Sequence, residues 1–176
     1  MSALIPLGRY TEVCENWCYY VYCKQNGDQA AWTVKVARQG ADTRRGGAQC
    51  KKVQPNKCSN KGTGDGKNGK WPKHKHGWDC DEQPKASNAQ GGAGAATRCI
   101  DPTENRSEGL VWMKFINGKT ADQPDYLDDT TPVNVVLDDS WNGGLCKSLH
   151  HPDVTVCPQA ASPNDPGVEN DLERQQ

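Results

Sequence analysis

Nine cysteines in 176 residues limit what this chain can fold into more than any other feature. Only 34% of the residues are hydrophobic and there is a single Phe, so one modest core is all that the chain can build. Zinc modules usually repeat close Cys pairs, whereas here only Cys14, Cys18 and Cys23 cluster and the other six are scattered. We therefore expect disulfides and an oxidising, extracellular location.

The spacing indicates the cysteine pairing only in part. Cys146 with Cys157 would close a short C-terminal loop, and Cys80 with Cys99 would join two neighbouring strands. The other five cysteines stay unassigned, and the odd total leaves at least one thiol unpaired or bonded to another chain.

Charge is strongly polarised along the chain, although the formal net charge is only −1. Residues 44–76 contain ten Lys or Arg and one acid, whereas residues 120–176 contain eleven acids and two basic residues. The basic stretch is either a solvated loop or a track for a nucleic-acid backbone.

No apolar run approaches the roughly 20 residues that a membrane-spanning helix needs. Residues 1–7 also lack the charged region and the long apolar stretch of an export signal, so we expect that signal to be absent from this sequence.

We expect one domain over residues 1–157. Within it, the Gly- and Lys-rich residues 59–76 predict a long basic surface loop, and the acidic residues 158–176 predict a disordered tail. An apolar cluster predicts a short helix over residues 14–23. Short apolar or alternating stretches predict strands over residues 32–37, 133–137 and 154–157.

Residues 77–118 carry the most informative pattern. It predicts, in order, a strand that ends before Pro84, a glycine-rich turn over residues 91–95, a second strand over 97–100 and a helix over 104–116. We expect an α+β fold in which a small antiparallel sheet packs on this central helix, with Trp112, Met113 and Phe115 in the core, stapled by disulfides.

Three carboxylates, Asp79, Asp81 and Glu82, lie within four positions at the end of the first of these strands. Crowded like charges raise one another's pKa unless a cation neutralises them, so the cluster is either a solvated surface or a site. Glu104 and Asn105 add oxygen donors at the start of the helix. Such ligands suit Mg²⁺, Mn²⁺ or Ca²⁺ better than zinc.

Four blocks in order resemble the NucA/NucB family of secreted, metal-dependent, sequence-nonspecific deoxyribonucleases, in a cysteine-rich, fungal-type form. The blocks are residues 5–10 (IPLGRY), 38–45 (RQGADTRR), 79–84 (DCDEQP) with the turn 91–95 (GGAGA), and 104–106 (ENR) with Gly109. The family usually has Arg in place of Cys80 and an aromatic residue in place of Gln83. The cysteine suggests that a disulfide replaces an ionic contact there.

The resemblance implies a strand–strand–helix unit like that of ββα-metal nucleases, acting as a monomer on DNA with Mg²⁺ or Mn²⁺, or alternatively Ca²⁺. Glu82 would be the general base, Asn105 a metal ligand, and Asp81 a second ligand or an orienting carboxylate. Arg106 would grip the scissile phosphate. The remaining predicted substrate-binding residues are Arg44, Arg45, Lys73 and His76.

Three other interpretations stay open. Asn105-Arg106-Ser107 is also an N-glycosylation sequon, and a glycosylated Asn105 could not bind a metal. The chain could be a non-catalytic, disulfide-rich secreted module that binds polyanions or a protein partner. A zinc-binding Cys/His module is the third, and most of its cysteines would then be thiols.

Overall fold

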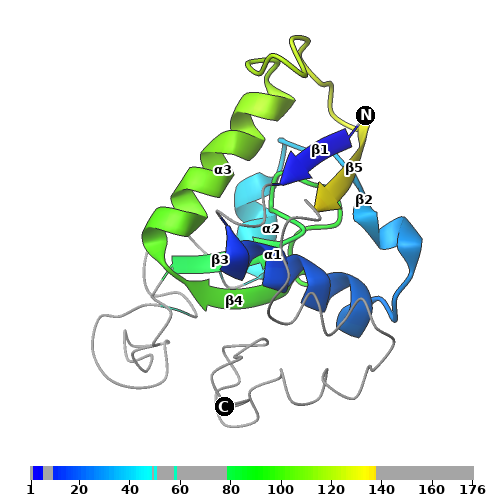
Figure 1. Cartoon of the computed structure of the whole chain (residues 1–176). Helices are drawn as coiled ribbons and strands as arrows, with labels where there is room; N and C mark the ends of the chain where they lie inside the picture. The colour runs from blue at the N-terminus through cyan, green and yellow to red at the C-terminus, as the bar shows by residue number, and fades with distance from the viewer. Residues whose placement is uncertain (1, 6–9, 49, 51–57, 59–78, 138–176) are drawn as a thin grey trace, which may run out of the picture.

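The structure is a computed structural model that describes residues 2–5, 10–48, 50, 58 and 79–137. The fold is α+β, as the sequence predicts (Figure 1). Its elements are β1 (Ser2–Ile5), α1 (Thr11–Cys18), the π-helical turn η2 (Tyr19–Lys24), the 3₁₀ turn η3 (Gln29–Trp32), β2 (Thr33–Lys35), α2 (Ala41–Gly47), β3 (Asp79–Gln83), β4 (Ala96–Ile100), α3 (Pro102–Ile116) and β5 (Pro132–Leu137). Within this part of the chain, no helix is long and apolar enough to cross a membrane.

The strands form two separate small sheets rather than one. In the first, β5 lies between β1 and β2, parallel to β1 and antiparallel to β2. The second is the antiparallel pair β3–β4, in which Cys80 lies opposite Cys99 and Asp81 opposite Arg98. The expected strand–strand–helix order is therefore present as β3, β4 and α3.

Helix α1 supplies the centre of the core. Its Val13, Cys14 and Trp17 are fully buried, and η2 continues the same apolar stripe with Val21. Helix α3 instead runs along one side of the molecule (Figure 1) and buries a single face. The prediction that Met113 is a core residue is wrong, because it lies on the outer face of α3 and is 41% exposed.

Both ends of α3 follow from local sequence. The Asp101 carboxylate accepts hydrogen bonds from the backbone N–H groups of Thr103 (2.7 Å) and Glu104 (3.4 Å), and Pro102 occupies the first turn. The helix ends before Gly118, whose φ of +64° and close approach to the Pro124–Asp125 backbone exclude a side chain. The predicted end of this helix is confirmed, whereas it begins at Pro102, two residues before the predicted start, because Asp101 caps it and Pro102 fits its first turn.

The other predicted elements fare differently. The helix over 14–23 is present as α1 and η2, and the strand over 133–137 as β5. The strand expected over 32–37 is shorter, because η3 includes Trp32. Helix α2 was not predicted, since three of its seven residues are Gly or Thr, which are poor helix formers. Predictions for residues 59–76, 154–157 and 158–176 fall outside the described residues.

Two disulfides, Cys50–Cys80 and Cys58–Cys99, staple the β3–β4 hairpin to the chain that precedes it. The predicted Cys80–Cys99 bond is therefore wrong. The two residues are cross-strand neighbours, but each sulfur bonds to a cysteine earlier in the sequence, Cys50 or Cys58. Cys18 and Cys23 are also in disulfides, whereas Cys14 carries a buried thiol. The predicted Cys146–Cys157 pair lies outside the described residues.

Candidate active site

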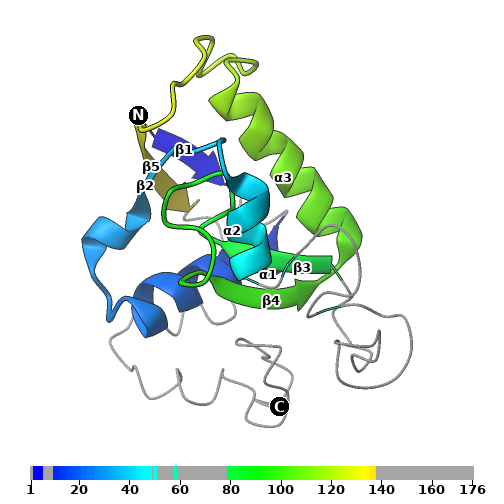
Figure 2. The ribbon, with the colours of Figure 1, turned by 180° about the vertical axis from the view of Figure 1, so that it is seen from behind.

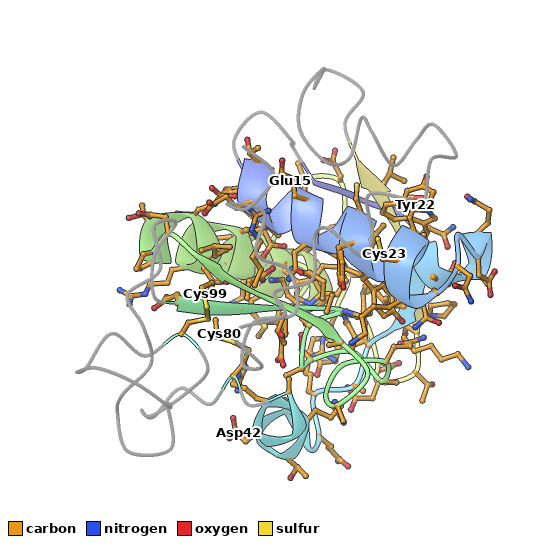
Figure 3. All side chains as sticks on the ribbon, turned by 90° about the horizontal axis from the view of Figure 1, so that it is seen from below. Glu15, Tyr22, Cys23, Asp42, Cys80 and Cys99 are labelled. Carbon is orange, nitrogen blue, oxygen red and sulfur yellow. A yellow bond between two sulfur atoms is a disulfide. The ribbon has the colours of Figure 1, made fainter. Side chains whose placement is uncertain are left out.

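Strand β3 carries the acidic cluster, and its alternation divides the cluster between two faces. Asp79, Asp81 and Gln83 point to one side, toward α1 and α3, which we call the α3 face of β3. Cys80 and Glu82 point to the other side, toward α2, which we call the α2 face. Figure 3 shows α1 and α2, labelled at Glu15 and Asp42, on opposite sides of the hairpin.

Asp81, on the α3 face, is surrounded by donors. It is 1% exposed, and its Oδ2 accepts a hydrogen bond of 2.8 Å from Asn16 Nδ2 of α1. Gln83 Nε2 lies 3.0 Å from Oδ1 and 3.2 Å from Oδ2 of the same carboxylate. Both oxygens of Asp81 are therefore engaged within the protein.

Lys85 forms an ion pair with Glu108 of α3, and its Nζ lies 3.7 Å from Asp81 Oδ1. Burial by itself would lower the pKa of Lys85, but the negative charges of Glu108 and Asp81 outweigh it and raise that pKa. Burial raises the pKa of Glu108, and Lys85 opposes that shift. An ammonium group thus supplies the positive charge between two buried carboxylates.

Glu104 serves as a helix cap. Its Oε1 accepts hydrogen bonds from the backbone N–H groups of Glu12 (2.7 Å) and Val13 (3.1 Å) at the start of α1. Glu12 returns the contact, because its Oε2 accepts a 3.1 Å hydrogen bond from the Asp101 N–H. Burial raises the pKa of Glu104 to about 7 despite these donors. Helices α1 and α3 therefore stabilise each other's first turns.

Asn105 and Arg106 follow Glu104 in the first turns of α3. Asn105 is half-buried, and its side-chain amide makes no hydrogen bond to any other described residue. Arg106 is 72% exposed and pairs with Asp79, with Nε 3.1 Å from Oδ2. Asn105 thus offers an open oxygen, whereas Arg106 is a surface cation already paired to a carboxylate.

Glu82 differs from the other carboxylates of β3. It is 6% exposed, and its Oε1 accepts a 2.8 Å hydrogen bond from the Ala86 N–H. Its Oε2 is buried without a hydrogen-bond partner among the described residues. Burial raises the pKa of Glu82 to about 7, while Arg45 of α2 and the Ala86 N–H act to lower it. A carboxyl group with one anchored oxygen, one oxygen without a donor and a pKa of about 7 is suited to accepting a proton near neutral pH.

The two adjacent arginines of α2, Arg44 and Arg45, also have different partners. The Arg45 guanidinium pairs with the exposed carboxylate of Asp42, NH1 to Oδ1 at 2.7 Å, and its positive charge acts to lower the pKa of Glu82. Arg44 instead donates to backbone carbonyls, including that of Ala86 at 2.7 Å from its Nε. The predicted residues Lys73 and His76 lie outside the described residues.

The structure thus places the predicted site residues on both sides of β3. Asp81, Asn105 and Arg106 belong to the α3 side, and Glu82, Arg44 and Arg45 to the α2 side. Sequence reasoning did not select Lys85, Glu108 or Asn16. A signal existed for Glu108, because it shares the buried stripe of α3 with Trp112, where an unpaired charge is costly.

The oxygen atoms available as metal ligands fit a divalent cation that keeps most of its waters better than one fully coordinated by protein side chains. Among the described residues, no three His, Cys, Asp or Glu side chains are grouped to hold a metal ion. Asp81 already has its donors, so of the two predicted ligands only Asn105 is open. Mg²⁺ keeps several of its waters and commonly uses one or two protein ligands together with substrate phosphate, so a single open ligand is compatible with it.

A sequence-family model described as Deoxyribonuclease NucA/NucB matches residues 17–126. The match covers well over half of the chain and includes α2, β3, β4 and α3, the elements that carry every described candidate residue. The chain belongs to the NucA/NucB family of deoxyribonucleases. We found no curated protein of similar sequence.

Proposed function

We propose that this deoxyribonuclease is a secreted, divalent-metal-dependent endonuclease that cleaves DNA without sequence specificity, with Glu82 as its general base. The observation that carries the proposal is the geometry of Glu82, which is buried on the α2 face with Oε1 held by the Ala86 N–H and with no hydrogen bond from a described residue to Oε2. A base needs this arrangement, because a fixed carboxyl group presents one oxygen to the attacking water.

Arg45 would bind the scissile phosphate on the same face. Its guanidinium influences Glu82 directly, and its present partner, Asp42, is an exposed carboxylate that a phosphate can replace. Glu82 Oε2 would take the proton from the water while Arg45 neutralises charge on the phosphate. Asp81 would orient β3 rather than bind metal, because Asn16, Gln83 and Lys85 occupy its oxygens.

The divalent cation would be Mg²⁺ or Mn²⁺, with Asn105 as its protein ligand. When bound, it would supply positive charge to the phosphate and the leaving oxygen. Asn105 belongs to α3 and Glu82 faces α2, so this assignment requires the cation to reach the scissile phosphate around the edge of the β3–β4 hairpin, and the Asn105→Ala variant below tests it. Arg106 and the basic residues Lys73 and His76 would add contacts to backbone phosphates, which carry no sequence information.

Disulfides at Cys50–Cys80 and Cys58–Cys99, with Cys18 and Cys23 also oxidised, support secretion. Bonds of this kind form and persist in extracellular compartments and are rare in a reducing cytosol.

The test is cleavage of supercoiled plasmid by the oxidised protein with Mg²⁺, Mn²⁺, Ca²⁺ or a chelator. We expect chelator to abolish nicking and Glu82→Gln to lower kcat about 10²- to 10⁴-fold. Asn105→Ala should weaken activation by the metal, measured as a higher metal concentration at half-maximal rate. Asp122→Asn, which changes an exposed carboxylate, is the matched control and should cleave normally.

Two results would overturn the proposal. Full activity of folded Glu82→Gln would remove Glu82 as the base. Undiminished nicking in chelator would remove the metal requirement. A wild-type protein that binds DNA but leaves it intact with every metal would instead support a non-catalytic polyanion-binding module.

A further inference from the structure

Arg44 and Arg45 are neighbours in α2, yet their guanidinium groups do different things. Arg44 donates from Nε to the carbonyl of Ala86 at 2.7 Å and from one terminal nitrogen to the carbonyls of Gln39, at 2.8 Å, and Ala37. Three of its five N–H groups are therefore committed to backbone oxygens. Among the described residues Arg45, by contrast, pairs only with the exposed side chain of Asp42.

The three carbonyls that Arg44 holds come from two different segments. Ala37 and Gln39 lie in the connection from β2 to α2, whereas Ala86 lies in the loop that follows β3. Figure 2 shows α2 lying against this loop. Arg44 thus ties the loop after β3 to the segment that enters α2.

Glycine permits this close approach. Gly92 of the same loop has φ of +103°, and a Cβ there would lie 3.3 Å from Arg44 Cβ. A Cβ at Gly91 would overlap the carbonyl oxygen of Lys85. The glycine turn that the sequence predicts therefore lets the loop lie directly on the stem of Arg44.

Ala86 connects Arg44 to Glu82. Its carbonyl oxygen accepts from Arg44 Nε, and its N–H donates to Glu82 Oε1 at 2.8 Å. A change in the position of Ala86 therefore changes where the Glu82 carboxyl group points. No described donor holds Glu82 Oε2, so this single hydrogen bond sets the orientation of the side chain.

We propose that Arg44 is a positioning residue for Glu82, acting through Ala86, and that it does not bind DNA. The inference rests on the proposed function, because it assigns Arg44 a role toward the base named there. It differs from the sequence-based prediction, in which both Arg44 and Arg45 bind the substrate. Arg45 is left as the phosphate-binding member of the pair.

The experiment compares Arg44→Gln with Arg45→Gln in steady-state cleavage of double-stranded DNA at several salt concentrations. For Arg44→Gln we expect kcat to fall roughly 10- to 100-fold with KM and its salt dependence unchanged, because a small displacement of the base slows the chemical step. For Arg45→Gln we expect KM to rise and the slope of log KM against log salt to fall, because a phosphate contact is lost.

A loss of folded protein could also lower kcat, so two further variants keep the test decisive. Arg44→Lys retains one donor group and should recover part of kcat. In a Glu82→Gln background, Arg44→Gln should cause little further loss, because its effect passes through the base, whereas a general loss of folded enzyme would lower both backgrounds equally.

The outcomes separate the two claims. If Arg44→Gln raises KM and reduces the salt slope as Arg45→Gln does, Arg44 binds DNA and the inference is wrong. Equal losses from Arg44→Gln in both backgrounds would also overturn it. If Glu82→Gln itself cleaves DNA normally, the proposed function fails first, independently of Arg44.

Discussion

The carboxylates on the two faces of β3 differ in how many hydrogen bonds they accept. On the α3 face, Asp81 has hydrogen bonds to both oxygens and shares the ammonium of Lys85 with Glu108. On the α2 face, Glu82 has one hydrogen bond and one open, buried oxygen. A buried carboxylate with donors on both oxygens is stabilised in its charged form, whereas one with a buried oxygen that lacks a donor is costly to ionise.

This comparison predicts that charge changes on the α3 face mainly alter stability and that changes on the α2 face mainly alter activity. The α3 face lies against α1 and α3, which contribute Val13, Trp17, Trp112, Phe115 and Ile116 to the core. The α2 face is closed by a seven-residue helix and the Cys50–Cys80 disulfide.

The largest effect on stability should come from removing the ammonium of the α3 face. Lys85→Met leaves Asp81 and Glu108 buried without their cation, so we expect the free energy of unfolding to fall by about 3–5 kcal/mol. Urea titration with intact disulfides measures it. The double variant Lys85→Met/Glu108→Met removes the charge pair together and should recover most of the loss. If Lys85→Met alone is as stable as wild type, the ammonium of Lys85 does not stabilise the buried carboxylates of Asp81 and Glu108.

A pH-dependent effect of intermediate size should come from Glu82. Its pKa is about 7 in the folded protein and 4.5 in the absence of the fold, so folding favours the protonated form. The stabilisation is complete below pH 4.5 and is lost as pH rises through about 7. The free energy of unfolding of Glu82→Gln, measured relative to that of the wild type, should therefore increase as pH rises from 5 to 8, by at most roughly 3 kcal/mol.

Urea titrations of both proteins at the two pH values measure this difference. Asp122→Asn, at an exposed position, should show no such change between the same pH values. A constant difference between Glu82→Gln and wild type across this range would show that Glu82 is ionised as easily in the folded protein as in the unfolded chain, and the contrast between the two faces would disappear.

Much of the α3 side could be predicted from sequence, because local signals determine it. Asp101 and Pro102 start α3, Gly118 ends it, and period-two alternation separates Asp81 from Glu82. The resemblance in the DCDEQP and ENR blocks then selected residues that the structure describes on β3 and α3.

The α2 side could not be predicted in this way, because its contacts join residues far apart in the chain. Arg44 and Ala86 are 42 positions apart, and the sequence gives no sign that the first of two adjacent arginines binds backbone carbonyls. The disulfides illustrate the same limit. Cys80 and Cys99 are correctly placed as neighbours, but their bonds go to Cys50 and Cys58, whose positions depend on the folded path of the connecting chain.

The smallest effect on stability should come from the Arg106–Asp79 pair, at the outer end of the α3 face. Arg106 is 72% exposed, so Arg106→Gln should change the free energy of unfolding by less than about 1 kcal/mol. If Arg106 also grips DNA, this variant should raise KM and lower its salt dependence. Asp79→Asn should then lower KM, because it releases Arg106 from a competing carboxylate. Unchanged KM in both variants would make the pair a surface contact only, and the α3 face would then contribute to DNA binding through Asn105 alone.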